Sequence, residues 1–260
     1  MFLFPLGGNC LRWHASNPWL EPLQPNNPLT AFTSVNLRFF FTIFLLLCAA
    51  LRAQTNEVRP VLHGSIDGNT YVSPTGAFRM PIPVLPELGG VVYDTDNVVT
   101  FADEFKTHVS VAVFLQDATQ RWENETRGRR DYLIFFFSNY VMPDFSQRAP
   151  GAKIEGARFL PGVQDGALIV YTLLPGGSMF TNRISLTGET DPALVAKRGN
   201  LLFVKDEHVF VISLELAERV LEHNTYHKTT AEEDELLRTR LLGLLGQIEF
   251  SSPRAAPGKK

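Results

Sequence analysis

The feature that most constrains the fold is an apolar run from Asn36 to Ala53, NLRFFFTIFLLLCAALRA, which divides the chain into two unlike parts. Phe39 to Leu51 is apolar apart from Thr42 and has an arginine on either side. An amphipathic core helix would show a polar face, and this run has none. A membrane-spanning helix needs about 20 apolar residues, so the run is short for a permanent anchor. A basic flank, a short apolar core and a small exit residue are typical of a secretory signal peptide. The pattern therefore predicts a signal peptide over residues 35–53.

The segment before this run has a different character. Residues 1–34 are rich in proline, glycine and asparagine and show no sustained periodicity, which predicts a disordered leader. Signal peptides begin at the N-terminus of the translated chain. We therefore expect that translation starts later than Met1, with Val35 encoded by a GTG initiation codon.

Charge and cysteine content limit the function of the part that follows Ala53. Three of the 24 basic residues and one of the 27 acidic residues precede Gln54, which leaves 21 basic against 26 acidic residues. This acidic balance argues against non-specific nucleic-acid binding. Both cysteines, Cys10 and Cys48, lie before the predicted cleavage. Thiol catalysis, a disulfide framework and cysteine-rich zinc sites are therefore excluded for an exported domain that starts at Gln54.

The exported part is predicted to hold one domain. Residues 54–68 contain Pro60 and two glycines and are expected to form a linker, residues 69–250 a single domain, and residues 251–260 a disordered tail. Alternating apolar residues and turn signals predict many short strands. These are Thr70–Ser73, Ala77–Met80, Val91–Tyr93, Val98–Ala102, His108–Leu115, Lys153–Leu160, Ala167–Leu174, Asn200–Val204, His208–Leu214 and Ile248–Phe250.

Two segments favour helices. Apolar residues at helical spacing favour a helix over Asp131–Tyr140, with a buried strand as the alternative, and Met142-Pro143 is expected to end it. Thr230 and Glu233 have the spacing of a capping box for a last helix that Gly246 would end. Many strands with two helices predict an α+β fold, in which an antiparallel sheet is flanked by helices.

The opening hairpin resembles a known family. The strand Tyr71-Val72-Ser73 leads to Gly76-Ala77-Phe78-Arg79-Met80-Pro81, which is similar to the Tyr-bearing strand and Gly-x-Phe strand of PsbP-like domains. The resemblance covers roughly residues 69–250. It implies an α/β/α sandwich in an exported accessory or binding protein without known catalysis. Pro81 is followed by Ile82-Pro83 where that family has Gly-Trp, and no functional residue is carried over.

A basic cluster provides the candidate binding residues. Arg127, Arg129 and Arg130 lie just before the predicted middle helix, where positive charge opposes the helix dipole. Local helix stability therefore does not account for them, whereas a bound anion or an acidic partner surface would. Trp122 nearby is a candidate anchor. The alternative is that the three arginines are simply solvated in a loop.

Metal and catalytic sites have weaker signals. His223 and His227 are four residues apart and could share a helix face, but they lack the His-Glu-x-x-His pattern of a zinc enzyme. We therefore predict no cofactor, no metal and no catalytic residue, and favour a non-enzymatic exported domain that binds a protein or a small ligand. One alternative is a hydrolase or metal-dependent enzyme assembled from scattered side chains, with candidates His63, His108, His208, His223 and Asp165. Another is a membrane-anchored domain that keeps the segment 39–51 uncleaved. We expect the domain to be exported, to the periplasm or to the outside of the cell, and tethered to the membrane in that last alternative.

Overall fold

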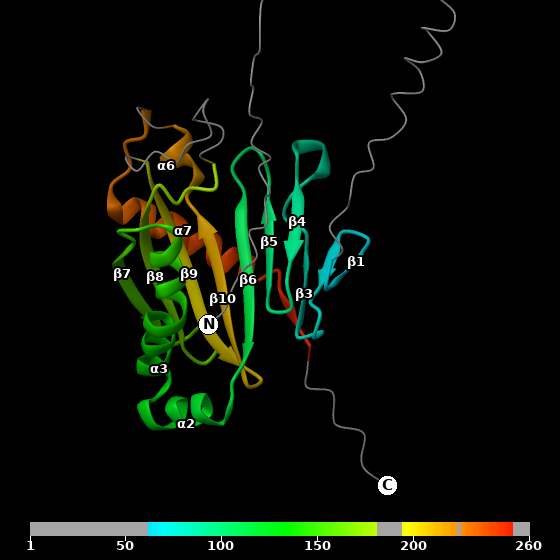
Figure 1. The fold of residues 1–260 in the computed structure, drawn as a ribbon, viewed down its shortest axis with the longest axis vertical. Helices are drawn as coiled ribbons and strands as arrows, with labels where there is room; N and C mark the ends of the chain where they lie inside the picture. Colours follow the sequence, from blue (N-terminus) through cyan, green and yellow to red (C-terminus); the bar gives the residue numbers. More distant parts are fainter. Residues whose placement is uncertain (1–61, 181–193, 223–224, 252–260) are drawn as a thin grey trace, which may run out of the picture. The chain divides into compact units, whose positions relative to one another are not determined.

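A twisted antiparallel sheet forms the centre of the domain, with helices on both of its faces (Figure 1). The computed structural model describes residues 62–180, 194–222 and 225–251, all within the unit Arg59–Lys260. The central sheet has seven strands in the order β4-β5-β6-β10-β9-β8-β7, and every neighbouring pair is antiparallel. The strands are β4 (Val91–Asp94), β5 (Val98–Ala102), β6 (His108–Leu115), β7 (Lys153–Leu160), β8 (Ala167–Pro175), β9 (Val195–Lys205) and β10 (His208–Glu215).

A smaller sheet of four short strands packs against one face of the central sheet. Its order is β1 (Ser65–Asp67), β2 (Thr70–Val72), β3 (Phe78–Pro81) and β11 (Glu249–Phe250), which brings together the two ends of the domain. The ring of Tyr71 meets Phe101 of β5 edge-on, and Phe78 meets Phe210 of β10. β1 lies inside the segment 54–68 that the sequence predicts as a linker.

The helices divide between the two faces of the central sheet. One face carries a nearly continuous helical segment, and the other carries α7 beside the small sheet (Figure 1). The helices are the 3₁₀ turn η1 (Pro86–Leu88), α2 (Ala118–Arg127), α3 (Arg129–Phe136), the π turn η2 (Phe137–Val141), α4 (Met142–Arg148), α6 (Ala217–Leu221) and α7 (Thr230–Leu245). The α+β class and the sandwich of helix, antiparallel sheet and helix are as predicted. Among the residues described, no helix combines the length and apolar character needed to cross a membrane.

Along the inner strands, successive apolar side chains point to opposite faces of the sheet and so contribute to both halves of the core. In β8, Ile169 and Tyr171 pack toward α7 and the small sheet, whereas Leu168 and Val170 pack toward α3. Side chains of successive strand residues point to opposite faces, so an apolar residue at every position indicates a strand covered on both sides. The helix face is filled by Tyr132, Leu133, Phe136 and Phe137, which are all buried.

The middle helix is confirmed, but it does not end at Met142-Pro143. The π turn η2 connects α3 directly to α4, which begins at Met142 and carries Pro143 in its first turn. Proline has no N–H, and its ring collides with the carbonyl four residues earlier in a regular α-helix. The wider π turn before Pro143 is consistent with relief of that collision, so the chain continues as a helix instead of ending.

The last helix begins one residue earlier than the sequence predicts. Thr229, not Thr230, is the N-cap: its side chain accepts from the Glu232 N–H, and the Glu232 carboxylate accepts from the Thr229 N–H. Glu233, the residue expected in the capping box, is instead 1 % exposed and faces the sheet. Both threonine–glutamate pairs have the required spacing, and burial of Glu233 decides between them.

Candidate functional site

The site lies at the end of the central sheet where α2 crosses beneath the hairpin turns. α2 starts directly after β6 because Asp117 caps it: the Asp117 carboxylate accepts from the Gln120 N–H at 2.7 Å, and Gln120 Oε1 accepts from the Asp117 N–H at 3.3 Å. The Gln116 N–H donates to the Glu207 carbonyl at 2.8 Å, and Arg121 Nη1 donates to the Gln116 carbonyl at 2.7 Å. These bonds tie the start of α2 to the turn between β9 and β10.

Two turns with left-handed backbone form the opposite wall. Asp206 and Glu207 connect β9 to β10 with φ of 48° and 63°, and Gln164 and Asp165 precede β8 with φ of 47° and 56°. Among the described residues these four are the only non-glycine residues with positive φ, and all four line the same cavity. A two-residue hairpin turn of type I′, such as Asp206-Glu207 between β9 and β10, requires this conformation at both positions, where Asn-Gly is the commoner pair. Backbone conformations of this kind concentrate at binding sites.

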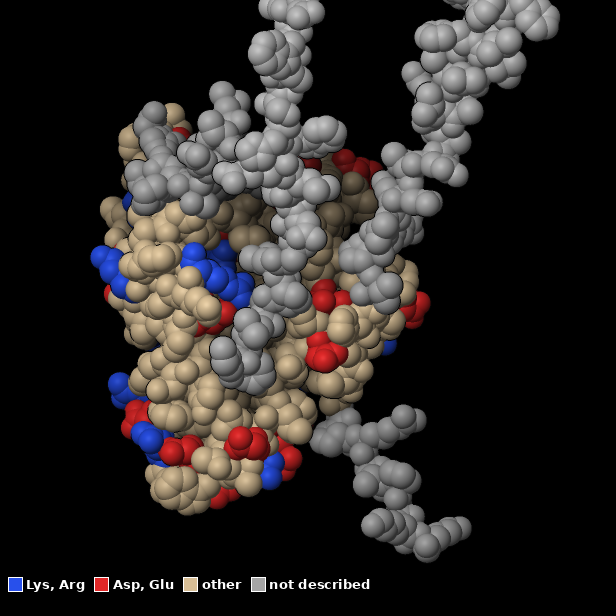
Figure 2. Space-filling view, viewed as in Figure 1, with Lys and Arg blue, Asp and Glu red and all other residues tan. Residues whose placement is uncertain are grey.

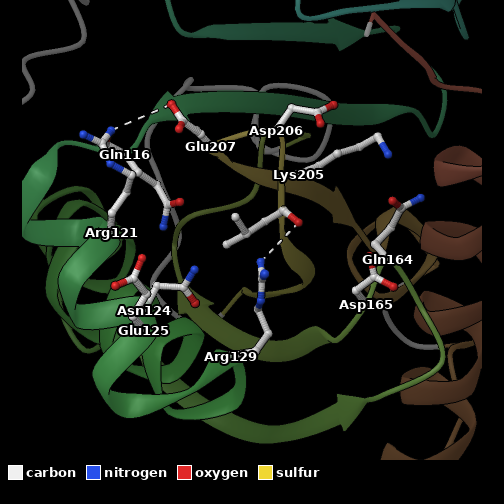
Figure 3. A pocket seen from close by; sticks show the side chains of 11 residues that line it. Gln116, Arg121, Asn124, Glu125, Arg129, Gln164, Asp165, Lys205, Asp206 and Glu207 are labelled. Carbon is white, nitrogen blue, oxygen red and sulfur yellow. Dashed lines mark hydrogen bonds and ion pairs between the residues drawn. The ribbon is translucent and has the colours of Figure 1, made fainter. Parts of the chain in front are cut away.

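Between α2 and these turns lies a cavity of about 380 Å³ (Figure 3). Its walls come from segments that are far apart in the sequence: residues 116–129, 164–165 and 204–207. The half-buried and buried lining side chains are mostly hydrogen-bond donors, among them two arginines and three side-chain amides. We call four of these residues the floor of the cavity: Gln116, Asn124, Arg129 and Gln164. Half-buried Lys205 also lines the cavity, and Arg121, whose side chain is 43 % exposed, lies nearer its mouth.

Arg129 is the central cation of the floor. Its Nη1 donates to the Val204 carbonyl at 3.2 Å, and it forms no ion pair with the described residues. Burial lowers the pKa of Arg129, an effect that the charge of nearby Asp165 opposes. A side chain on Gly166 would bring its Cβ to 3.0 Å from Arg129 Cγ, so the glycine leaves room for the arginine stem. A guanidinium has five N–H donors in a fixed fork, and most of those on Arg129 remain available to a ligand.

Gln116 is the second notable group of the floor. It is 2 % exposed, and its Nε2 finds no hydrogen-bond partner among the described residues. The hydroxyl of Tyr132, which is fully buried, also lacks a partner of normal geometry there, but a side-chain hydrogen-bond interaction with Gln116 acts to lower its pKa, so the two groups lie beside each other. Burial is the main cause that raises the pKa of Tyr132. Buried polar groups are nearly always hydrogen-bonded, so the Gln116 amide, which lines the cavity beside the Tyr132 hydroxyl, can take either that hydroxyl or a ligand as its partner.

The mouth of the cavity has the opposite chemistry. Its exposed lining residues are all carboxylates, which we call the rim: Glu125, Asp165, Asp206 and Glu207. Glu207 lies 3.9 Å from the Arg121 guanidinium, and the other three form no ion pair with the described residues. Acidic and basic side chains lie close together over the end of the domain that carries α2 (Figure 2). Arg129 and the side-chain amides therefore lie deep in the cavity, and four carboxylates surround its opening together with Arg121.

The structure separates the predicted basic cluster. Gly128, with φ of 79°, divides Arg127 in the last turn of α2 from Arg129 in the first turn of α3. Arg127 pairs with Glu123 and lies 4.5 Å from the centre of the Phe135 ring. At a helix C-terminus positive charge is favourable, so Arg127 has a local reason to be there, contrary to expectation. Arg130 is exposed at the start of α3.

Trp122 and the histidines do not join the cavity. Trp122 is 58 % exposed on α2. His227 is exposed before α7, and His223 lies outside the described residues. The other scattered candidates are apart: His63 contacts Asp96 at 2.7 Å, His108 is buried in β6, and His208 contacts the Asp206 carbonyl. Among the described residues no group of three or more His, Cys, Asp or Glu side chains could hold a metal ion.

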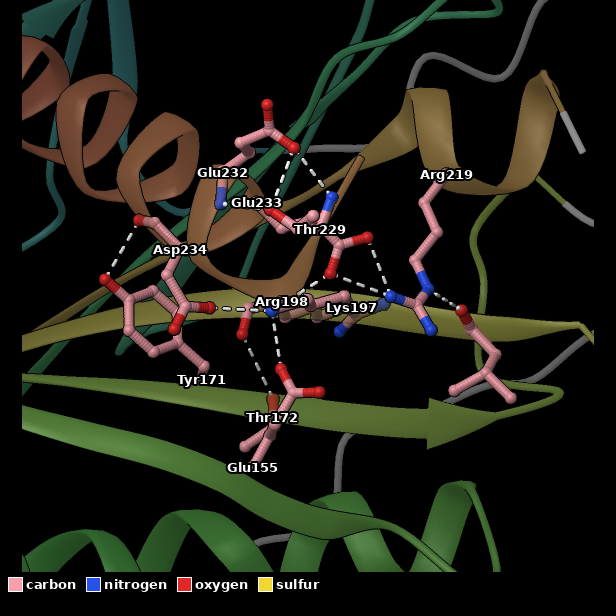
Figure 4. Close-up of polar contacts among 11 residues, drawn as sticks. Glu155, Tyr171, Thr172, Lys197, Arg198, Arg219, Thr229, Glu232, Glu233 and Asp234 are labelled. Atoms are coloured by element: carbon pink, nitrogen blue, oxygen red, sulfur yellow. Dashed lines mark hydrogen bonds and ion pairs between the residues drawn. The ribbon is translucent and has the colours of Figure 1, made fainter. Parts of the chain in front are cut away.

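A second polar cluster lies near the other end of β9 and is closed (Figure 4). The ammonium of Lys197, which is fully buried, lies 2.5 Å from Glu155, 3.0 Å from Glu233 and 2.6 Å from Asp234. Arg219 of α6 donates to both oxygens of Glu233 at 2.7 and 2.8 Å. Burial acts to lower the pKa of Lys197, but the three carboxylates outweigh it and raise that pKa above its ordinary value.

On the opposite face of β9, Arg198 and Glu215 form a related pair. Glu215 is fully buried and accepts from Ser178 Oγ at 2.6 Å, from the Met179 N–H at 3.1 Å and from Arg198 at 3.3 Å. His108 is buried nearby. Burial, together with the charge of Arg198, lowers the pKa of His108 to about 3, so the imidazole is neutral at ordinary pH. The charged groups of both clusters are paired with one another, although Arg198 Nε and the Tyr226 hydroxyl are buried without a hydrogen-bond partner among the described residues. We take the cavity as the candidate site because it offers a ligand space as well as donors.

One element of the cavity has a signal in the sequence, although the predicted elements do not include it. Asp117 and Gln120 have the spacing of a capping box, which indicates the start of α2, a helix absent from the sequence prediction. No residue of α2 is buried, so the helix lacks the apolar stripe on which periodicity depends. Gln116 and Gln164 carry no sequence signal, because their role depends on which turns meet at the end of the sheet.

The fold and cavity define a class: an α+β sandwich domain with a polar ligand-sized cavity at one end of its sheet. No known sequence family matches the chain, and a search of curated proteins also finds no match. Solved structures show similarity in fold. The solution structure of cyanobacterial PsbP from Synechocystis matches with a TM-score of 0.44 and 13 % identity, over 72 % of this chain and 98 % of that one.

Two further structures match over the same 72 % of this chain. The Ran-binding protein Mog1p of Saccharomyces cerevisiae matches with a TM-score of 0.41 and 11 % identity, over 96 % of its length. A protein of Bacteroides thetaiotaomicron matches with a TM-score of 0.33 and 12 % identity, over 50 % of its length. A PsbP protein is thus among the structures that this chain resembles, as the opening hairpin predicts. At these identities the likeness concerns the fold alone.

Proposed function

We propose that this protein is an exported, non-enzymatic binding or accessory domain whose ligand site is the cavity between α2 and the hairpin turns. The observation that carries the proposal is the pair formed by Arg129 and Gln116. One is a half-buried guanidinium without an ion-pair partner, and the other is a buried amide whose Nε2 lacks a partner, both among described residues. Ligand sites are concave, and a few convergent polar groups in them fix the orientation of the ligand.

Export is the second part of the proposal. It is supported by the run Phe39–Leu51, with its arginine flanks. N-terminal sequencing and intact mass of the protein from its own cells test this part. A mature chain that begins at Gln54 in the periplasmic or secreted fraction is the expected result. A chain that retains residues 39–51 in the membrane fraction would instead indicate a tethered domain.

The rival hypothesis of a hydrolase or metal enzyme has less support from the geometry. Its candidates would have to meet in one cleft with a nucleophile, a base or a metal-ligand set. Of them, Asp165 lines the cavity, and His63, His108 and His208 lie elsewhere. The described residues that line the cavity include carboxylates, which can act as bases, but no serine, threonine, cysteine or histidine.

The binding function is tested by a screen of chemically diverse small molecules against the isotope-labelled full chain, followed by NMR. We expect saturable shifts of the Gln116 and Arg129 signals with at least one compound. A variant with Asn124→Trp, which fills the cavity from α2, should abolish those shifts without lowering the melting temperature. Asn139→Trp, on the exposed side of η2, is the matched control and should leave them unchanged. A screen in which no compound perturbs the cavity would refute the proposal.

A further inference from the structure

Hydrogen-bond donors and carboxylates are distributed unevenly between the floor and the rim of the cavity, and this distribution limits the class of ligand that fits. Its floor presents the Arg129 guanidinium and the Nε2 of Gln116, whereas its rim presents four exposed carboxylates, of which Glu207 lies 3.9 Å from Arg121. An anionic group bound at the floor would gain charge-assisted hydrogen bonds, and a forked guanidinium fits a carboxylate with two parallel bonds. At the rim such an anion would meet repulsion, and a cation would meet attraction.

From this arrangement we infer that the ligand is a small zwitterion, with a carboxylate bound at the floor and an ammonium group at the rim. This inference rests on the proposed function, since it assigns a ligand class to the same cavity. A simple anion would satisfy Arg129 and Gln116 but leave the rim without a partner. A simple cation would be attracted to the rim but would have no acceptor to offer the floor. An amino acid, or a short chain that carries both end groups, satisfies both sets.

The interior of the cavity also favours small molecules over a protein surface. About 380 Å³ is within the range of small-molecule sites, and the floor lies behind α2 and the two hairpin turns. The turns themselves are held in place by the sheet and by the Gln116–Glu207 backbone bond. The backbone that carries Asp206 and Glu207 is therefore tied to the start of α2, which lets the site discriminate ligands by the separation of their two charged ends.

The test is a matched set of five-carbon probes titrated calorimetrically into the full chain: 5-aminopentanoate, pentanoate, pentylamine and 1,5-pentanediol. The four- and six-carbon amino acids 4-aminobutanoate and 6-aminohexanoate complete the set by varying the span. We expect the best amino acid to bind at least about tenfold more tightly than either one-ended probe, since it alone satisfies the floor and the rim. The diol should not bind measurably.

Variants assign each end of the probe. Arg129→Gln should weaken the binding of the amino acid and of pentanoate by about tenfold or more. Arg129→Lys should have an intermediate affinity, because lysine keeps the charge but loses the forked pair of donors. Arg127→Gln, the matched control in the same segment, should change neither by more than about twofold. Asp165→Asn and Asp206→Asn preserve the left-handed backbone, since asparagine tolerates that conformation. Together they should reduce the affinity for the amino acid to that for pentanoate, with pentanoate itself not weakened.

The outcomes distinguish failure of the ligand class from failure of the proposed binding function. The inference of a zwitterionic ligand would be overturned by equal binding of pentanoate and the amino acids, by preference for the diol, or by no binding of any probe. If the diverse screen still finds a ligand in the cavity, the binding function stands and only the ligand class fails. If the amino acids bind but Arg127→Gln weakens them as much as Arg129→Gln does, the inference is also overturned, because the site then lies outside the cavity.

Discussion

Lys197 shows how one side chain can determine the local arrangement of three elements. Its ammonium is surrounded by Glu155 of β7 and by Glu233 and Asp234 of α7, with Arg219 of α6 on the far side of Glu233. A buried charge is tolerated only when it is paired, and pairing fixes the position of every partner. The cluster therefore orients α6 and α7 on the sheet, in addition to the apolar packing beneath them.

At this scale the first prediction concerns Glu233. Glu233→Gln removes the carboxylate shared by Lys197 and Arg219, and we expect the free energy of unfolding to fall by about 3 kcal/mol, the usual loss when a buried pair is broken. Glu235→Gln, two residues further along the same helix, removes an exposed pair with Arg238 and should have little effect. Urea unfolding followed by circular dichroism measures both. Equal losses in the two variants would show that the buried cluster contributes no more than a surface pair.

The same residue explains a limit of the sequence analysis. The sequence predicts that β9 starts at Asn200, five residues after its observed start at Val195. The charged residues Lys197 and Arg198 are of a kind that usually lies exposed in a turn. In the structure Lys197 is fully buried and Arg198 is largely so, each paired with carboxylates from distant segments. Charge normally marks the surface, and only knowledge of the partners shows that these two charges lie inside.

At the scale of elements, the start of α7 gives the second prediction. Thr229→Ala should lower the free energy of unfolding by about 1 kcal/mol, because the Thr229 side chain accepts the otherwise unpaired Glu232 N–H. Thr230→Ala changes the next residue, which lies inside the first turn and makes no such bond, so it should be close to neutral. Thermal unfolding of the two variants distinguishes the two possible capping boxes. A larger loss for Thr230→Ala would contradict the observed cap.

The third prediction concerns the packing of α7 on β9. Gly199 lies under the helix, and a Cβ there would approach Leu241 Cδ1 to 2.9 Å and Leu237 Cβ to 3.2 Å. Gly199→Ala should therefore force the helix outward and cost about 1–3 kcal/mol. Gly243→Ala, inside the helix with nothing within 4 Å of its Cβ, should stabilise the protein by about 0.5–1 kcal/mol through helix propensity. Chemical unfolding of both variants tests the opposite signs, and a neutral Gly199→Ala would disprove the close contact.

Elements differ in how well the sequence predicts them. Strands such as β6 and β8 were found because burial on one or both faces leaves a direct pattern of apolar residues. α2 was missed because none of its residues is buried, and the helical segment was predicted to stop at Pro143 because a π turn leaves no distinct pattern. Elements that hold the core are visible in a sequence, whereas those that wall a polar cavity are less so.

At the scale of the whole molecule, the cavity depends on topology. Arg129 was among the arginines selected from the sequence, but the other residues that line the cavity come from the β6–α2 junction, α2, the β7–β8 turn, and the end of β9 with the β9–β10 turn. These segments meet because β6, β10, β9 and β8 are successive neighbours in the sheet, so that their turns share one end. Without the strand order, nothing in the sequence relates Gln116 to Asp165 or Glu207.

Stability of the whole domain should depend on pH through His108. Its pKa falls from 6.5 to about 3 on folding, because burial and the charge of Arg198 disfavour the imidazolium. Above pH 6.5 the residue is neutral in both states, and its contribution to stability is complete. As the pH falls below 6.5 the unfolded chain binds the proton first, so stability falls progressively toward pH 3. Between pH 7 and pH 5 this group alone should lower the free energy of unfolding by about 2 kcal/mol.

The variant His108→Gln isolates that contribution from the carboxylates. Asp103 and Glu218 have lowered pKa values and also lose stabilising interactions in acid, but they do so in both proteins. Urea unfolding at pH 7 and pH 5 should show that the variant loses about 2 kcal/mol less than the native chain. His227→Gln, at an exposed position, should keep the native pH dependence. If native and His108→Gln proteins lose the same stability over this interval, His108 is not held neutral by the fold, and its burial beside Arg198 would have to be looser than the structure shows.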